Sequence, residues 1–589
     1  MSSTPKRTRL PKLCGADIEL GNFILGLQRT GGTGYDASRA VLREIDGVPS
    51  RYSYGYSSWE GGTYTGGWGQ ASTAQDWGRK YLRSNGGCVY IDLDHLELAI
   101  PEVQSAFDHV AAWNAMLRIV RRAWRSANEK LPEGESIQLL VNNSDGQSNS
   151  YGSHLNFLIT RRAWNNIFNR KLQYQLFLAA YQASSIIFTG QGKVGSENGA
   201  PPVPFQLSQR ADFFETLAGL QTTYNRPVIN SRDESLCGKF GSGCDGEMAR
   251  LHCIFFDAGL CQVASLLKVG VMQIVLAMIE AEQVNMAVLL DDPVDAVRRW
   301  SHDISLRTRV PIVSGPRISA VELQLLILEQ AKRFCDAGGC DGIVPGAEEI
   351  LRLWEDTLLK LKVGPIDDES LAALAPRLDW ALKLRILKRA MKLHPELTWN
   401  SPGVRHLDQM YGSLDPEDGL YWQYEASGEV GQVVSEDDIA YFVDNPPQNT
   451  RAWTRALLLE IAGPDGISSV DWDSITFRLE GSGYRSVYPK LEMPNPLAFT
   501  KADVEGVSRP GTPLSGILEA LGATENTEAN VTVPLWTQWL GTCREVAACR
   551  SFAPGAASRE VRAGNNQGKA HRGQARTRRL PGRGREART

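Results

Sequence analysis

An alternation of apolar and acidic side chains over residues 85–102, NGGCVYIDLDHLELAIPE, constrains the fold of this chain more than any other feature. Successive side chains of a β-strand point to opposite faces. Tyr90 and Asp92 therefore share one face of a strand over 87–93, and Asp94, directly after it, points the same way. Ionised carboxylates repel one another and are costly to bury unless they are paired or bind a metal. The pattern therefore predicts a strand whose carboxylates are either solvated or hold a cation.

A second acidic segment lies earlier in the chain. In CGADIELG, residues 14–21, Asp17 and Glu19 fall on one face of a short strand, and Glu97 and Glu102 follow the later strand. Hard divalent cations such as Mg²⁺ take oxygen ligands, usually beside nucleotide phosphates. A solvated strand edge explains any one of these carboxylates equally well, but the whole set, flanked by apolar residues, favours a metal site.

Two other segments contain residues suited to a binding site. Residues 141–154, VNNSDGQSNSYGSH, form a polar loop between two apolar strands, but any turn favours this composition, and a lone histidine such as His154 is more often structural than a ligand. Arg451 and Arg455 are four residues apart, so on a helix they share a face that could hold phosphate oxygens. Surface ion pairing explains the same spacing.

The order of elements predicts an α+β fold, with an antiparallel-type sheet and helices followed by a small C-terminal domain. Residues 31–70, dense in Gly, Tyr and Trp, have no periodicity and are typical of a functional lid or a disordered insertion. We place the catalytic domain at 13–410, the small domain at 411–500 and a poorly ordered extension at 501–589. Strands are predicted over 87–93 and, as a pair, over 137–141 and 155–160. Helices are predicted over 105–128, 172–187 and 263–281, with three more between 319 and 393.

Charge and composition exclude several classes of protein. The formal charge of −4 divides into +8 for residues 559–589, which have ten Lys/Arg and two Asp/Glu, and −12 for the rest. A basic nucleic-acid-binding body is therefore excluded, and only the tail, expected to be disordered, is suited to weak nucleic-acid contacts. Residues 263–281 contain Lys268 and Glu280, which indicates a buried helix and no membrane span. Ten cysteines without a C-x-x-C motif indicate mostly reduced, buried thiols and a cytoplasmic location.

Eight segments, in order, resemble the family of Pup ligases and depupylases (Pup deamidases). They are GADIELG, NGGCVYIDLDHLELAIPE, NNSDGQSNSYGSHLNF, FQLSQRADFFE, RPVINSRDE, RLHCIFFDAGLCQVASLLKVG, NTRAWTRA and WDSITF, from about residue 13 to residue 500. The resemblance implies a glutamine-synthetase-like catalytic domain that binds ATP and Mg²⁺ on an acidic sheet. It also implies that the substrate is the isopeptide bond between the small modifier Pup and a protein lysine.

The resemblance also assigns roles to individual residues. Asp92 matches the catalytic aspartate, and a carboxylate kept ionised beside Mg²⁺ is able to act as a nucleophile on an amide carbonyl or as a base toward a lysine amine. The implied metal ligands are Asp17, Glu19, Tyr90 and Glu97, and the implied nucleotide contacts are Trp472, Arg451 and Arg455.

The direction of the reaction is predicted from a chain length. Asp17 and Tyr90 are 73 residues apart, which includes the 31–70 stretch and favours the depupylase branch, where a loop is inserted. The implied partners are Pup or a Pup-like modifier and its conjugates, with a link to the proteasome. A ligase that forms the isopeptide bond and a nucleotide-binding regulator without activity are the alternatives.

Four positions depart from the family pattern. The family's arginine before the tyrosine is Cys88, and its threonine near the strand end is Ile100. The glutamate of its H-E-N motif, which lies beside the nucleotide–metal site in the family, is Leu155, so a carboxylate is lost there. Asp17 stands where the family has a glutamate, one methylene longer. These departures imply a divergent paralogue whose substrate need not be Pup.

Overall fold

The structure is a computed structural model that describes residues 9–26, 33–50, 77–234, 236–237, 248–363, 367–480, 486–509 and 511–525. All of them belong to one compact unit, residues 1–529. Residues 31–32 and 51–70 of the predicted insertion and the basic tail, residues 559–589, lie outside the described residues.

An antiparallel sheet organises the catalytic domain. Among the described residues it has eight strands, in the order β12-β7-β1-β5-β4-β3-β2, with β6 paired to the second half of β1. The predicted α+β class is therefore confirmed. The strands are β1 (Cys14–Leu25), β2 (Val48–Pro49), β3 (Trp77–Tyr81), β4 (Cys88–Asp92), β5 (His95–Ala99), β6 (Ser136–Leu140), β7 (Ser153–Thr160) and β12 (Met248–Cys253).

The two faces of this sheet differ as the sequence alternation predicts. On β1, Ala16, Ile18 and Leu20 are buried in the main core, whereas Asp17 and Glu19 point to the opposite face. The same alternation holds on β4, β5, β7 and β12. One face therefore packs on helices, and the other supplies the polar side chains of a site.

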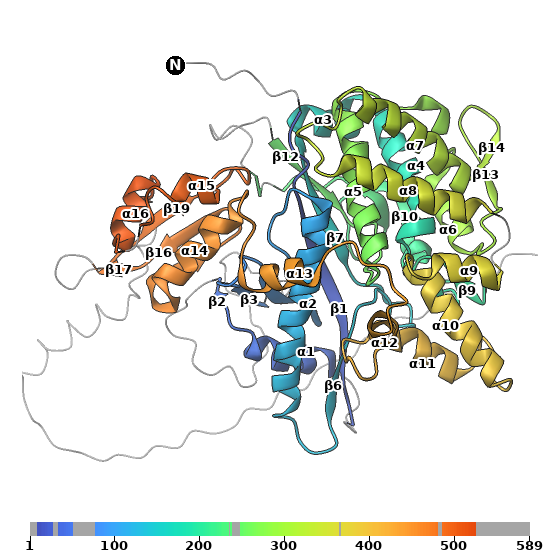
Figure 1. Cartoon of the computed structure of the whole chain (residues 1–589), viewed down its shortest axis with the longest axis horizontal. Coiled ribbons are helices and arrows are strands. Elements are labelled where there is room, and N and C mark those ends of the chain that lie inside the picture. The colour runs from blue at the N-terminus through green and yellow to red at the C-terminus, as the bar shows by residue number, and fades with distance from the viewer. Residues whose placement is uncertain are drawn as a thin grey trace, which may run out of the picture. The chain divides into compact units, whose positions relative to one another are not determined.

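Helices cover the apolar face (Figure 1). Helix α5 is long and apolar enough to span a membrane by composition alone, but all of its residues are buried inside the protein, as in a core helix. The predicted helices over 105–128, 172–187 and 263–281 are confirmed. The described α-helices between residues 100 and 450 are α2 (Ala106–Asn128), α3 (Arg161–Asn165), α4 (Leu172–Thr189), α5 (Gln262–Glu280), α6 (Pro293–Ser301), α7 (Ala320–Asp336), α8 (Ala347–Lys362), α9 (Asp368–Leu374), α10 (Asp379–Leu393), α11 (Pro402–Met410), α12 (Leu420–Ala426) and α13 (Glu436–Asp444).

Three local predictions are corrected. Residues 33–44 of the predicted insertion form helix α1 (Thr33–Glu44), because Ala37, Val41 and Leu42 pack into the core. β6 and β7 do not pair with each other; each pairs with β1. Between residues 319 and 393 the described chain has four helices, α7 to α10, where three were predicted.

The small C-terminal module begins later and ends later than predicted. Residues 411–450 belong to the catalytic core, to which Tyr411, Tyr421 and Phe442 contribute, whereas a separate apolar cluster joins Leu458 to Leu518. The prediction of poor order is wrong for 501–509 and 511–525, which form part of the module. Its elements are α14 (Ala452–Ala462), β15 (Ile467–Val470), β16 (Ser474–Phe477), β17 (Leu479–Glu480), β18 (Ser486–Val487), β19 (Pro489–Glu492), α15 (Lys501–Val504), α16 (Leu514–Ala520) and β20 (Thr524–Glu525).

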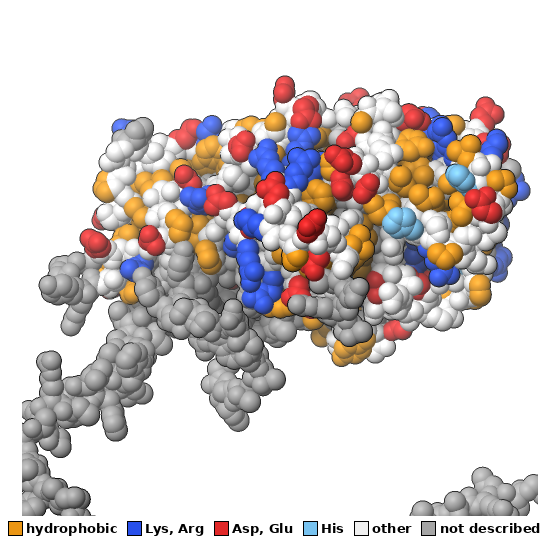
Figure 2. Space-filling model, turned by 90° about the horizontal axis from the view of Figure 1, so that it is seen from below, with side chains coloured by type: hydrophobic (Ala, Val, Ile, Leu, Met, Phe, Trp, Pro, Cys, Tyr) orange, Lys and Arg blue, Asp and Glu red, His pale blue; other side chains and the backbone are white. Residues whose placement is uncertain are grey.

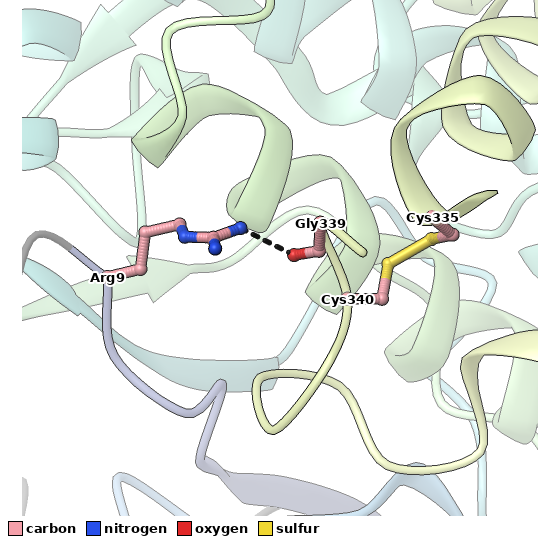
Figure 3. Close-up of a disulfide and its surroundings, with 4 residues drawn as sticks. All are labelled: Arg9, Cys335, Gly339 and Cys340. Carbon is pink, nitrogen blue, oxygen red and sulfur yellow. Dashed lines mark hydrogen bonds between the residues drawn. A yellow bond between two sulfur atoms is a disulfide. The ribbon is translucent and has the colours of Figure 1, made fainter. Parts of the chain in front are cut away.

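The segment before β1 contacts the turn that follows the C-terminal end of α7. Arg9 donates from Nη1 to the carbonyl oxygen of Gly339 at 2.8 Å, in a turn closed by a disulfide between Cys335 and Cys340 (Figure 3). The cysteine spacing predicted mostly reduced thiols and did not indicate this bond. Cys14, Cys237, Cys253 and Cys261 agree with the expectation, since they are buried thiols.

Charges of both signs are mixed on the surface. On the face shown in Figure 2, the described Lys and Arg side chains lie next to Asp and Glu side chains and are interrupted by apolar ones. This mixture agrees with the overall charge balance, which gave no reason to expect a basic body.

Candidate active site

A cavity of about 1380 Å³ opens on the polar face of the sheet. Strands β1, β4, β5, β7 and β12 contribute to its lining. Arg451, Asp471 and Trp472, from the part of the chain after residue 450, contribute as well. Each residue predicted as catalytic or metal-binding lines this cavity, namely Asp17, Glu19, Tyr90, Asp92 and Glu97.

The register of three strands brings the first group of carboxylates together. Glu19 of β1 lies opposite Glu97 of β5, which in turn lies opposite Tyr90 of β4. Asp92 is two residues beyond Tyr90 on the same face, and Glu19, Asp92 and Glu97 each offer a carboxylate oxygen within 4.8 Å of the others. Segments that are far apart in the sequence thus form one acidic group.

The electrostatics of this group favour a cation. Burial raises the pKa of Glu97 well above its usual value, and the negative charges of Asp17, Glu19 and Asp92 raise it further. Oε2 of Glu97 is buried and has no hydrogen-bond partner among the described residues. Three carboxylates supply the hard oxygen donors that Mg²⁺ takes, so the donor set fits the implied ion.

A second group lies beside the first and includes two histidines that the sequence analysis did not select. Asp17, His154 and His252 each offer one ligand atom within 4.8 Å of the others. His154 lies directly opposite Asp17 across β1 and β7, and its Nδ1 is 3.4 Å from Oδ2 of Asp17. His252 comes from β12, and its Nδ1 is buried without a hydrogen-bond partner among the described residues.

Hydrogen bonds hold Asp17 in its ionised form. Burial alone would raise the pKa of Asp17, but the hydrogen bond and charge of His154, with charges from His252 and Arg250, lower it to about 2. Asn156 donates its amide to Oδ1 of Asp17, and Arg250 donates to the amide oxygen of Asn156 at 2.6 Å. One carboxylate and two imidazoles form a donor set that suits a divalent metal.

Of the three residues predicted to contact nucleotide, two line the cavity and one does not. Trp472 is half-buried and lines the cavity, and so does Arg451. Arg455 is fully buried and does not line it. Both arginines pair with Glu102, with Arg451 Nε at 2.8 Å and Arg455 Nη2 at 2.6 Å from its carboxylate oxygens.

Two departures from the family pattern lie away from the cavity. Leu155 is fully buried in the core, because it occupies the opposite face of β7 from His154 and Asn156. The interpretation of Leu155 as a lost carboxylate beside the metal site is therefore wrong. Cys88 is buried among apolar residues shared with the C-terminal module. Near it, Arg79 of β3 places its Cζ 3.8 Å from the ring centroid of Tyr90 and supplies a cation to the cavity wall.

The polar loop over 141–154 forms one rim of the cavity. Asp145 accepts hydrogen bonds from the backbone amides of Gln147 and Asn149, at 2.7 and 3.1 Å. Glu197, from a different segment, accepts one from the amide of Ser148 at 2.9 Å. The turn composition seen in the sequence thus builds a braced rim, and Asp145, Gln147 and Asn149 line the cavity.

Comparisons with known proteins agree with this geometry. A sequence model of the family described as Pup-ligase protein matches residues 38–476. A depupylase of Acidothermus cellulolyticus is 35% identical over 424 residues, 72% of this chain and 79% of that protein. A Pup deamidase/depupylase of Mycolicibacterium smegmatis is 34% identical with the same coverage. A Pup–protein ligase of Acidimicrobium ferrooxidans is 34% identical over 424 residues, 70% of this chain and 87% of that protein.

Two solved structures share the fold. A complex between the prokaryotic ubiquitin-like protein Pup and its ligase has a TM-score of 0.68 at 21% identity and covers 93% of this chain and 99% of that chain. A Pup ligase in complex with ADP has a TM-score of 0.60 at 23% identity and covers 76% and 90%. From the family match and the coverage of these relatives, we conclude that the chain belongs to the Pup ligase family, in which both ligases and depupylases occur.

Proposed function

We propose that this protein is an ATP- and Mg²⁺-dependent cytoplasmic hydrolase that cleaves the isopeptide bond between Pup, or a Pup-like modifier, and a protein lysine. Deamidation of a C-terminal glutamine of the modifier belongs to the same proposal, because both reactions break an amide at a γ-carboxyl group. The observation that carries the proposal is the row of Glu19, Glu97 and Tyr90 beside Asp92, in one cavity.

In this proposal Asp92 is the reacting group. Its carboxylate attacks the amide carbonyl carbon, the carbon–nitrogen bond breaks, and the amine leaves with a proton from water. The hydroxide that remains opens the resulting anhydride to two carboxyl groups, one of which is Asp92 again, and the proton that they share passes to the released amine. Half-exposed at the end of β4, Asp92 is accessible to a substrate in the cavity.

The other residues would hold the groups that make this attack possible. Glu19, Tyr90 and Glu97 are the proposed ligands of one Mg²⁺, and Asp17, with His154 and His252, is the proposed ligand of a second divalent ion. Bound Mg²⁺ would supply positive charge that keeps carboxylates ionised and polarises the substrate carbonyl. Trp472 and Arg451 are the proposed nucleotide contacts from the C-terminal side of the cavity.

A specific observation keeps ligation as the second candidate. The Acidimicrobium relative at 34% identity is a ligase, and two solved structures among those that share the fold are of Pup ligases. In that direction Asp92 would act as a base toward a lysine amine, with no change in the rest of the site. The depupylase direction is favoured by the relatives from Acidothermus and Mycolicibacterium and by the 73 residues between Asp17 and Tyr90.

The test is an activity assay with three substrates. The full chain is incubated with ATP and MgCl₂ and with a Pup conjugate, Gln-ended Pup, or Glu-ended Pup plus an acceptor protein. We expect release of free target protein or deamidated Pup by the wild type. Conjugate formation from Glu-ended Pup alone would establish the ligase instead. Nucleotide binding without turnover of any substrate would contradict both and leave a regulator without activity, linked to the proteasome pathway through modifier recognition.

A further inference from the structure

The side chain of Arg455 connects the C-terminal module to the catalytic sheet. Its guanidinium has five N–H donors. Nε and Nη2 donate to the carbonyl oxygen of Gly86, at 3.2 and 2.8 Å. Nη1 and Nη2 donate to the carboxylate of Glu102, at 3.2 and 2.6 Å. Nη1 also donates to the backbone carbonyl oxygen of Trp472, at 2.9 Å. All five donors are therefore used inside the protein, and none is left for a phosphate.

The same guanidinium packs against the indole of Trp472. Cζ of Arg455 is 4.8 Å from the ring centroid of Trp472, within the range of a cation–π contact. Tyr81 meets the indole edge-on, with ring centroids 5.4 Å apart and planes at 71°, and its hydroxyl donates to Asp471, the neighbour of Trp472. The tryptophan is thus held by its carbonyl and by its ring.

Both anchors of Arg455 on the sheet side are rigid. Gly86 has a φ of +76°, and a Cβ at this position would lie 2.8 Å from the carbonyl oxygen of Ala452, so the turn before β4 fits closely against the start of α14. Glu102 is buried, and although burial alone would raise its pKa, the charges of Arg455 and Arg451 lower it to about 2. Glu102 therefore stays ionised near neutral pH.

We propose that Arg455 is a positioning residue that fixes the indole of Trp472 at the cavity wall as a stacking surface for the purine base of the nucleotide. This inference rests on the proposed nucleotide binding. It changes the role expected for Arg455 from a phosphate contact to a residue that acts through Trp472. Its distinguishing consequence is that losing Arg455 weakens binding through the base and not through the phosphates.

The test compares adenosine, AMP and ADP, each measured by calorimetry with MgCl₂ on the full chain. Stacking of a base on an aromatic ring is worth enough that Trp472→Ala should weaken all three about tenfold. Arg455→Lys keeps the charge next to Glu102 but loses the planar fork. We expect it to weaken all three ligands by a similar factor, about three- to tenfold, and to have no further effect in the Trp472→Ala background. Trp453→Phe, on the same helix and outside the cavity lining, is the matched control and should leave all three unchanged.

A loss confined to AMP and ADP, or a loss that adds to that of Trp472→Ala, would overturn the inference in favour of a direct phosphate contact. Absence of nucleotide binding by the wild type would contradict the proposed function itself. Fluorotryptophan labelling of the wild type gives a second measurement if Arg455→Lys does not fold. The Trp472 resonance, assigned with Trp472→Phe, should be a single narrow line that shifts with adenosine; a broad, averaged line would contradict a fixed indole.

Discussion

Glu97 and Glu102 are five residues apart and both are buried, yet their surroundings are opposite. Glu97 faces other carboxylates, its pKa is raised by burial and by their charges, and one of its oxygens has no hydrogen-bond partner among the described residues. Glu102 accepts from Arg451 and Arg455, and their charges lower its pKa to about 2 against the effect of burial.

The difference shows two uses of a buried carboxylate. A carboxylate whose charge is balanced by arginines holds parts of the fold together, and here it joins the sheet to the C-terminal module. One surrounded by like charges adds nothing to the stability of the metal-free protein and is suited to bind a cation. Changing these carboxylates one at a time separates the two uses.

The largest effect is expected for Asp92→Asn. An amide cannot act as the nucleophile, so we expect the rate of conjugate cleavage to fall at least about a thousandfold, or about 4 kcal/mol. Nucleotide affinity should change little. Gel-based cleavage assays check the rate, with Asp418→Asn, an exposed aspartate outside the cavity lining, as the matched control. Unchanged cleavage by Asp92→Asn would remove Asp92 from the proposed mechanism.

Glu102→Gln should be the most destabilising change. It leaves two buried guanidinium groups without a counter-charge, and we expect the free energy of unfolding to fall by about 3 kcal/mol. Urea denaturation measures this loss. Glu436→Gln, which breaks the exposed pair with Arg118, is the control and should cost less than about 1 kcal/mol. Equal losses in the two variants would show that Glu102 is not the anchor of the module.

The stabilising effect of Glu102 should disappear in acid. Its folded pKa of about 2 lies below the ordinary value of 4.5, so its contribution is complete above pH 4.5 and is lost as the pH falls toward 2. The shift corresponds to about 3 kcal/mol. Unfolding experiments between pH 5 and pH 2 should show a steeper decrease of stability for the wild type than for Glu102→Gln. Parallel decreases would contradict the assignment.

The smallest effect is expected for Glu97→Gln in the absence of metal. The change removes a buried charge that is repelled by its neighbours, so the free energy of unfolding in EDTA should rise by about 1 kcal/mol. A loss comparable to that of Glu102→Gln would mean that both glutamates are structural.

Much of the site was predictable from the sequence because strand alternation has a fixed period. Alternation placed Tyr90 and Asp92 on one face of a strand and Asp17 and Glu19 on one face of another. The family resemblance joined these four residues with Glu97 on one acidic sheet, and all five line the cavity. Alternation also explains why Leu155 lies in the core, a result that was missed because the phase of β7 was not applied to that position.

The features of the site that the sequence did not predict depend on the register of distant strands and on ion pairs between distant residues. His154 and His252 join Asp17 only through the register of β7 with β1 and β12, which no local pattern shows. The spacing of Arg451 and Arg455 indicated a shared helix face, but it did not show that Glu102 pairs with both. The helix over 33–44 was missed because its few core positions lie in a glycine- and tyrosine-rich stretch.

The most direct test of the central claim is a titration of the metal-free full chain with Mn²⁺ as a spectroscopic substitute for Mg²⁺, followed by electron paramagnetic resonance. The account predicts that the wild type and Glu102→Gln, where it is folded, bind Mn²⁺ alike, while Glu97→Gln binds it at least about tenfold more weakly. Equal binding by the wild type and Glu97→Gln, or no binding by the wild type, would contradict the claim that the unbalanced carboxylates on this sheet form a divalent-cation site.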